Sequence, residues 1–200
     1  MARGTGIAER QRPTPVQPPL TGRLQAFQQD LKNRDALDLF QTWVLRGVPV
    51  VYTDDVYQRL KKTIATRLSL NLVDVIMIGS AKLGFSLTSA PRFKLFSGTS
   101  DVDISIISPR LFEELWNQAH RFSTALRNPN DFYENLFLGR IHPNTVAPSN
   151  DTFRFRELQE LQDYLNQQAV YGRNSKHILV LRSWEVFQRT QCEVIEACRG

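Results

Sequence analysis

Two short segments carry the residue types that could do chemistry in this 200-residue chain. Gly79 and Ser80 follow directly after an apolar run at 73–78. Asp101 and Asp103 open a second apolar run about twenty residues later. Because residues two apart in a strand point to the same side, we expect these two aspartates to project together.

Neighbouring carboxylates in a strand that favours burial indicate a bound cation. Ionised Asp101 and Asp103 would repel each other, and burial would raise that cost. Hard oxygen ligands of this kind suit Mg²⁺ or Mn²⁺. Such an ion can hold the phosphates of a nucleoside triphosphate and stabilise the charge that develops during transfer. We therefore predict Asp101 and Asp103 as metal ligands, with Mg²⁺ or Mn²⁺ as the cofactor.

The Gly-Ser turn is predicted to bind the phosphates. Gly79 allows close approach of the backbone, and a helix starting near Ser80 would direct free amides at an anion. The Ser80 hydroxyl adds a donor, Lys82 is expected to pair with a phosphate, and Ser100 belongs to a donor-rich approach to the aspartates. A lone Asp-x-Asp or Gly-Ser pair is a weak signal, but their joint occurrence beside two apolar strands favours a metal–phosphate site over coincidence.

Apolar periodicity predicts the elements that position these residues. The fold class we expect is α/β (α+β), with a mixed sheet flanked by helices. The segment 131–150 is left without an assignment. The predicted helices cover 23–45, 54–70, a stretch opening at Pro109, 151–169 and 183–198, and the predicted strands cover 73–78, 102–107 and 176–182.

Composition indicates one globular domain behind a short arm. Residues 1–22 are rich in proline and are predicted to form a disordered arm, followed by a single domain over 23–200. The net charge of +5 suits phosphate or nucleic-acid ligands, although many basic proteins bind neither. No apolar run is long enough to span a bilayer and no signal segment opens the chain, so we expect a cytoplasmic protein without membrane contact.

At these residues the sequence resembles the nucleotidyltransferase superfamily related to DNA polymerase beta. The motif of that superfamily is an apolar strand, Gly-Ser, a helical turn and an aspartate pair on the next strand. The match covers residues 73–107, and the run from Gly79 to Leu87 resembles small bacterial nucleotidyltransferase-domain proteins.

The resemblance implies an activity and a set of partners. It implies metal-dependent transfer of a nucleoside monophosphate from ATP or another nucleoside triphosphate to a hydroxyl on nucleic acid, a nucleotide or a protein. It places Asp101 and Asp103 on the metal and Gly79 and Ser80 on the triphosphate. It also associates the chain with bacterial antiviral defence or toxin–antitoxin systems, and with a partner subunit.

One departure from the family pattern leaves alternatives open. Active members carry a third carboxylate on a later strand, and the strand predicted at 176–182 has none. Asp131, Asp151 and Glu157 are the substitutes, and we select Asp151 as catalytic because residues 152–155 could form a short strand. The alternative is a catalytically degenerate subunit that binds nucleotide or nucleic acid. A third reading is an interaction protein whose motif is vestigial.

Overall fold

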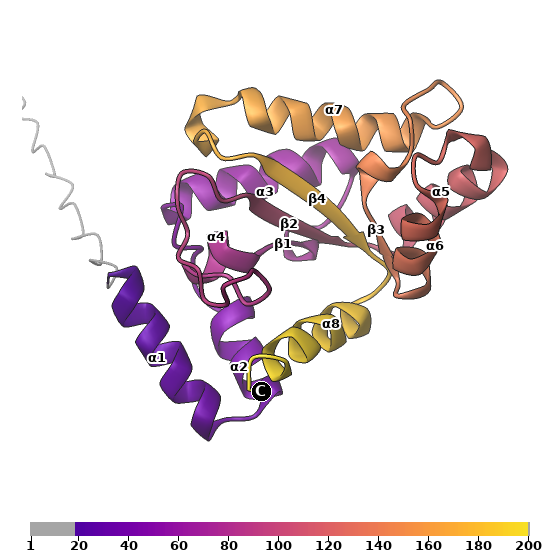
Figure 1. Ribbon diagram of the computed structural model, residues 1–200. Helices are drawn as coiled ribbons and strands as arrows, with labels where there is room; N and C mark the ends of the chain where they lie inside the picture. Colours follow the sequence, from indigo (N-terminus) through magenta and orange to yellow (C-terminus); the bar gives the residue numbers. More distant parts are fainter. Residues whose placement is uncertain (1–18, 200) are drawn as a thin grey trace, which may run out of the picture.

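The computed structural model describes residues 19–199, and their arrangement is shown in Figure 1. Residues 1–18 of the arm predicted over 1–22 lie outside the described residues. Helix α1 already begins at Leu20, before the predicted domain boundary.

A four-stranded mixed sheet forms the centre of the molecule, as the fold class predicted. The strand order is β1-β2-β4-β3, with β2 parallel to β4 and the two outer pairs antiparallel. The two central strands are rich in β-branched and apolar residues, which fit a surface packed on both sides. The strands are β1 (Val75–Ile78), β2 (Val102–Ile107), β3 (Arg140–Ile141) and β4 (Lys176–Leu181).

One face of the sheet packs against α3 (Asp54–Leu68), α5 (Pro109–Arg121) and α7 (Phe153–Gln167). Alternate residues of β2, such as Ile104 and Ile106, point into this core. The side-chain hydroxyl of Ser108 caps α5 by accepting a hydrogen bond from the amide of Leu111. Proline at the first position of α5 agrees with the helix predicted to open there.

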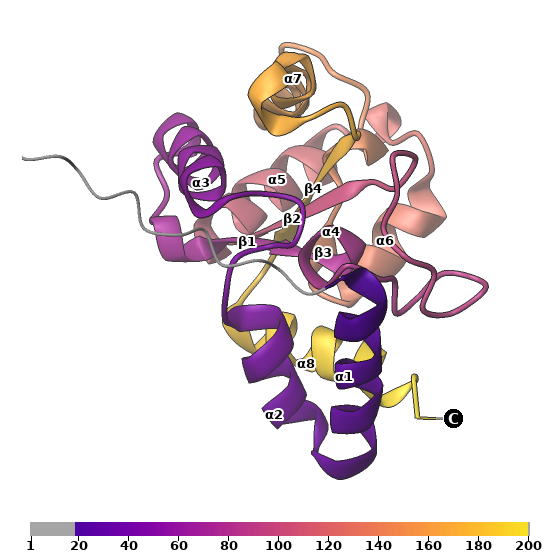
Figure 2. The ribbon, with the colours of Figure 1, turned by 90° about the vertical axis from the view of Figure 1, so that its left-hand side faces the viewer.

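The opposite face packs against α1 (Leu20–Asn33), α2 (Ala36–Leu39) and α8 (Trp184–Glu196). Figure 2 shows this layer below the sheet, with α3 and α7 above it. The second core holds an aromatic group in which Phe27 lies against Trp43 and Phe85, with ring centroids 5.4 and 5.1 Å away. The remaining helices are α4 (Gly79–Leu83) and α6 (Pro129–Phe137).

The single helix predicted over 23–45 is wrong. Helix α1 ends before Arg34, whose backbone is extended, and Asp35 then caps α2 by accepting a hydrogen bond from the amide of Asp38. A π-helical turn follows over Phe40–Leu45. The apolar spacing of the sequence skips a turn around Arg34, where the helix breaks. The break lets the chain reverse direction, so that Phe27 and Trp43 pack against each other.

Apart from the short strand at 152–155, which is replaced by the start of α7, the other predicted elements agree with the structure to within a few residues. In the first strand, residues 72–74 form a 3-10 turn and pairing starts at Val75. The unassigned segment contains α6 and the short strand β3. None of the helices between residues 19 and 199 is long and apolar enough to cross a membrane.

Candidate functional site

Gly79 and Asp103 meet where β1 ends and β2 begins. The antiparallel register places Ile78 opposite Asp103, so the residue after β1 lies against the aspartate side chain. A Cβ atom added to Gly79 would lie 2.8 Å from Oδ2 of Asp103. Gly79 also has a φ of +66°, a conformation that residues with a side chain rarely adopt. Glycine is therefore required here both by the backbone and by the carboxylate beside it.

His177, a residue that we had not predicted to be part of the site, lies beside Asp103 on the neighbouring strand and approaches the carboxylate of Asp101. The parallel register places His177 directly beside Asp103 on β4. Its Nε2 atom lies 3.5 Å from Oδ1 of Asp101, an ion pair only when the imidazole is protonated. Asp101 is 57% and His177 46% exposed, so both side chains are open to solvent, whereas Asp103 is half-buried.

The electrostatics of Asp103 favour a cation beside it. Burial raises the pKa of the Asp103 carboxyl, and the neighbouring charge of Asp101 raises it further, against the opposing influence of His177. Two residues along the same strand, the Ser105 hydroxyl is buried and has no hydrogen-bond partner among the described residues. A cation would relieve the repulsion between the two carboxylates.

The donor set fits a hard divalent ion shared with a substrate rather than a closed metal cage. Within residues 19–199, no group of three or more His, Cys, Asp or Glu side chains is placed to hold a metal. Mg²⁺ typically takes one or two carboxylates and completes its shell with water and substrate phosphates. Asp101 and Asp103 supply that number of carboxylates, so the residues present fit Mg²⁺ or Mn²⁺.

The predicted phosphate-binding residues lie partly at this site. Helix α4 begins at Gly79, close to the predicted start at Ser80. Ser80 is half-buried and directly follows Gly79, the residue that lies against the Asp103 carboxylate. The Ser100 hydroxyl accepts a hydrogen bond from the Ser97 amide, and the Asn174 side chain donates to the carbonyl oxygens of both serines. Ser100 therefore fixes the loop that leads into Asp101.

Lys82 does not join this group. Its side chain is 1% exposed, and its ammonium donates to the backbone carbonyls of Arg46 (2.7 Å) and Gly47 (2.5 Å). Burial, with Arg23 and Lys61 nearby, lowers the pKa of Lys82 to about 8. The predicted phosphate contact is therefore replaced by a structural one, in which Lys82 ties α4 to the loop before α3.

Asp151 also lies apart from the aspartate pair, and the short strand predicted at 152–155 is wrong. Asp151 lies in an exposed turn, and α7 begins at Phe153. The other end of α7 faces the site, because the Asn166 side chain accepts a hydrogen bond from the amide of Lys176. At 1.5 Å per residue, Asp151 lies roughly 20 Å along the helix from that point.

The other two candidate carboxylates are also on helices. Asp131 lies in the first turn of α6. Glu157 is on α7 and pairs with Arg154 at 2.7 Å. In the described residues the strand position beside Asp103 is held by a histidine and by none of the three candidates.

His177 is the residue that sequence reasoning missed, and His142, which we expected to be a structural or solvated loop histidine, lies near it. His142 follows β3 on the other side of β4, and burial, with the charges of Arg140 and His177, lowers the pKa of its imidazole. The signal for His177 was a polar residue at the start of an apolar strand, the same pattern that identified Asp103. It was overlooked because the search was for a carboxylate.

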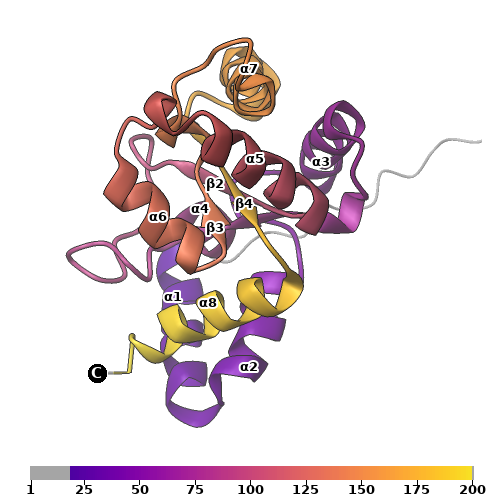
Figure 3. The ribbon, with the colours of Figure 1, turned by 90° about the vertical axis from the view of Figure 1, so that its right-hand side faces the viewer.

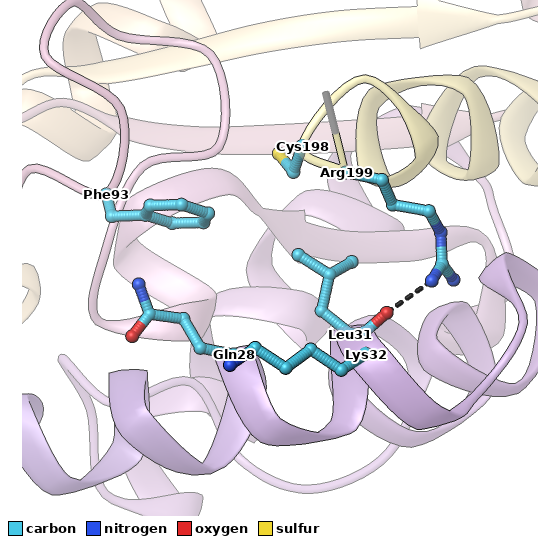
Figure 4. A pocket seen from close by; sticks show the side chains of 6 residues that line it. All are labelled: Gln28, Leu31, Lys32, Phe93, Cys198 and Arg199. Carbon is cyan, nitrogen blue, oxygen red and sulfur yellow. Dashed lines mark hydrogen bonds between the residues drawn. The ribbon is translucent and has the colours of Figure 1, made fainter.

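A separate hollow of about 450 Å³ lies between α1, the loop containing Phe93 and the end of α8 (Figure 4). Its lining includes Lys32 and Arg199, but the Arg199 guanidinium is already bound to the backbone carbonyls of Leu31 and Arg34. Arg199 therefore closes the end of α8 onto α1, and we assign this hollow no part in the site.

A scan against protein-family models gave no match, and searches of curated proteins and of solved structures gave no significant one.

Proposed function

We propose that the protein is a metal-dependent nucleotidyltransferase of the type related to DNA polymerase beta. The observation that carries the proposal is the approach of Asp103 to Gly79, with Asp101 close enough for its charge to raise the pKa of the Asp103 carboxyl. It brings together the two sequence signals, one for a metal and one for a triphosphate, at one end of the sheet.

In this proposal Asp101 and Asp103 hold Mg²⁺ or Mn²⁺, and Gly79 and Ser80 line the path of the triphosphate. When bound, the ion supplies attraction for the phosphate oxygens and for the charge that develops on them. The open edge beside Asp101 and His177 leaves room for an acceptor, because both side chains are solvent-exposed.

The reaction conserves atoms and charge in a simple way. The acceptor hydroxyl oxygen forms a bond to the α-phosphorus, and the bond from that phosphorus to the bridging oxygen of the β-phosphate breaks. Pyrophosphate leaves with the bonding electrons, and the hydroxyl proton passes to solvent. The protein's contribution is to position the two reactants and to hold the negative charge of the phosphates.

A second candidate is a nucleotide-binding subunit without turnover. The observation in its favour is that His177 stands beside Asp103, where the family resemblance implies a third carboxylate. Such a subunit would bind nucleotide in a metal-dependent way and release no pyrophosphate.

The acceptor, the cell compartment and the pathway belong to the proposal as well. A nucleic acid, a nucleotide or a protein hydroxyl is a suitable acceptor, with a partner subunit that completes the assembly. We place the reaction in the cytoplasm, and a role in bacterial defence or a toxin–antitoxin system remains a prediction from the resemblance.

Labelled nucleoside triphosphates test this proposal. The protein is incubated with each of them and Mg²⁺ or Mn²⁺, with and without RNA and DNA, and pyrophosphate and labelled products are measured. We expect turnover by the wild type that falls at least 100-fold in Asp101→Asn/Asp103→Asn, which removes the charge that would hold the ion. Binding without turnover selects the second candidate, and turnover that survives the double substitution contradicts both.

A further inference from the structure

An apolar groove lies between the aromatic side chains of α5 and α6. Its volume is about 440 Å³, and its walls include Trp116 of α5 and Tyr133 and Phe137 of α6. These rings are unusually open for aromatic residues, at 45%, 52% and 87% exposed. Figure 3 shows α5 and α6 next to the end of β4, with α8 below them.

A basic hollow of about 310 Å³ adjoins this groove. Phe137 and Arg182 line both, so the two form one continuous surface, which we call the aromatic–arginine surface. Arg140 of β3 and Arg189 of α8 complete its basic part. Three guanidinium groups from three different elements thus converge beside exposed rings.

Two of these guanidinium groups have no neutralising partner in the part of the chain that the structure describes. The Nε atom of Arg140 is buried and has no hydrogen-bond partner there. Among residues 19–199, the Arg182 side chain takes part in no hydrogen bond or ion pair. Of the three arginines, Arg189 alone lies near a carboxylate of the described residues, with its Nε atom 4.0 Å from Oε1 of Glu193. Glu113 lines the apolar groove between α5 and α6. The basic hollow therefore keeps an excess of positive charge.

The surface lies at the opposite end of β4 from the candidate site. Arg140 pairs with Leu181 at one end of β4, and His177 stands beside Asp103 near the other end. Leu181 is four residues along the strand from His177, which is roughly 13 Å. His142 follows β3 and lies between Arg140 and His177. Burial lowers the pKa of its imidazole, and the charges of these two residues lower it further. A ligand that contacts both the arginines and the aspartate pair must therefore span at least this length of β4.

We propose that the aromatic–arginine surface binds a single-stranded nucleic acid, whose phosphates pair with the arginines and whose bases stack on the exposed rings. This inference rests on the proposed function and names its acceptor class. Exposed aromatic side chains beside a basic groove are the usual means of holding unpaired bases. A purely apolar protein partner would leave the guanidinium groups of Arg140 and Arg182 without counter-charge.

Fluorescence anisotropy with a labelled oligouridine of about 15 nucleotides tests the inference. The titration is done in EDTA without nucleotide, so that it reports binding and not transfer. We expect Phe137→Ala/Arg182→Ala to weaken binding at least about 10-fold, since a base stack and a phosphate contact are lost together. The matched control is Phe153→Ala/Arg59→Ala, which removes the same residue types from exposed positions on α7 and α3.

Two further arms separate this inference from the proposed function. Phe137→Ala/Arg182→Ala should bind ATP with Mg²⁺ as well as the wild type even though it loses oligonucleotide binding, because neither residue lies at the aspartate pair. Wild-type affinity should fall steeply between about 50 and 200 mM salt, because phosphate contacts release counterions. Absence of binding by the wild type, or equal loss in the surface variant and its control, would overturn the inference and leave the groove to a protein partner.

Discussion

At the scale of single residues, Asp103 is held in a setting that its charge destabilises. Burial and Asp101 raise the pKa of its carboxyl above the ordinary value of 3.8. The folded protein therefore binds this proton more tightly than the unfolded chain does. The resulting stabilisation of the fold is fully present below pH 3.8 and is lost as the pH rises through the raised pKa. In the absence of metal, the ionised carboxylate therefore lowers the stability of the folded protein at neutral pH.

Asp103→Asn should consequently stabilise the metal-free protein. We expect its urea midpoint in EDTA at pH 7 to exceed that of the wild type, with a gap that closes as the pH approaches 4. Millimolar Mg²⁺ should stabilise the wild type and not the variant, because a ligand of the folded state adds to its stability. A variant less stable than the wild type in EDTA at pH 7 would contradict this account of Asp103.

For Lys82 we predict the opposite dependence of stability on pH, because burial lowers the pKa of its ammonium from 10.5 to about 8. Between those values the unfolded chain binds the proton better than the folded one, so raising the pH favours folding. Lys82→Met should remove this contribution. Urea unfolding of both proteins from pH 7 to pH 10 should show the wild type gaining stability relative to the variant, and a constant difference would argue against a buried ammonium.

At the scale of elements, the turn from β1 into α4 depends on glycine. Gly79→Ala would place a methyl group 2.8 Å from Oδ2 of Asp103 in a backbone with positive φ. Gly172 has a φ of +75° with a ψ of 178°, a region almost reserved for glycine, but open space around the missing Cβ, so Gly172→Ala carries backbone strain alone, about 1–3 kcal/mol.

The comparison of these two variants isolates the contact with the aspartate. We expect Gly79→Ala to lower stability by more than Gly172→Ala and to weaken metal-dependent nucleotide binding, which Gly172→Ala should leave unchanged. Thermal melts and nucleotide titrations measure the two effects. Equal behaviour of the variants would mean that Gly79 does not shape the carboxylate site.

The elements also show how far sequence reasoning reaches. The apolar β-branched runs predicted β2 and β4. Asp101 lies one residue before β2, so strand alternation alone does not set the direction of its side chain relative to Asp103. Strand order and register are set by contacts between distant segments, so nothing local to His177 indicated that it would stand beside Asp103. Lys82 was misjudged for the same reason, because the carbonyls that hold it come from the loop at 46–47.

At the scale of the whole molecule, helices from both ends of the chain close one face of the sheet. Phe27 of α1 is fully buried against Trp43 and Phe85, and α8 packs into the same core. Phe27→Ala should cost about 3–5 kcal/mol of unfolding free energy, as for other large-to-small changes in a core. Phe153→Ala, at a ring that is 49% exposed, should cost far less, and a urea titration of both would expose any error in this packing.

The central claim is that Asp101 and Asp103 form a metal-dependent triphosphate site, and calorimetric titration with ATP tests it most directly. The wild type, Asp101→Asn/Asp103→Asn and Asp151→Asn are each titrated with and without Mg²⁺. Asp151 is the matched control because it is an exposed carboxylate far from the pair. The account predicts Mg²⁺-dependent binding by the wild type and by Asp151→Asn, and its loss in the double variant. Binding that is independent of Mg²⁺ or unaffected by the double substitution would contradict it.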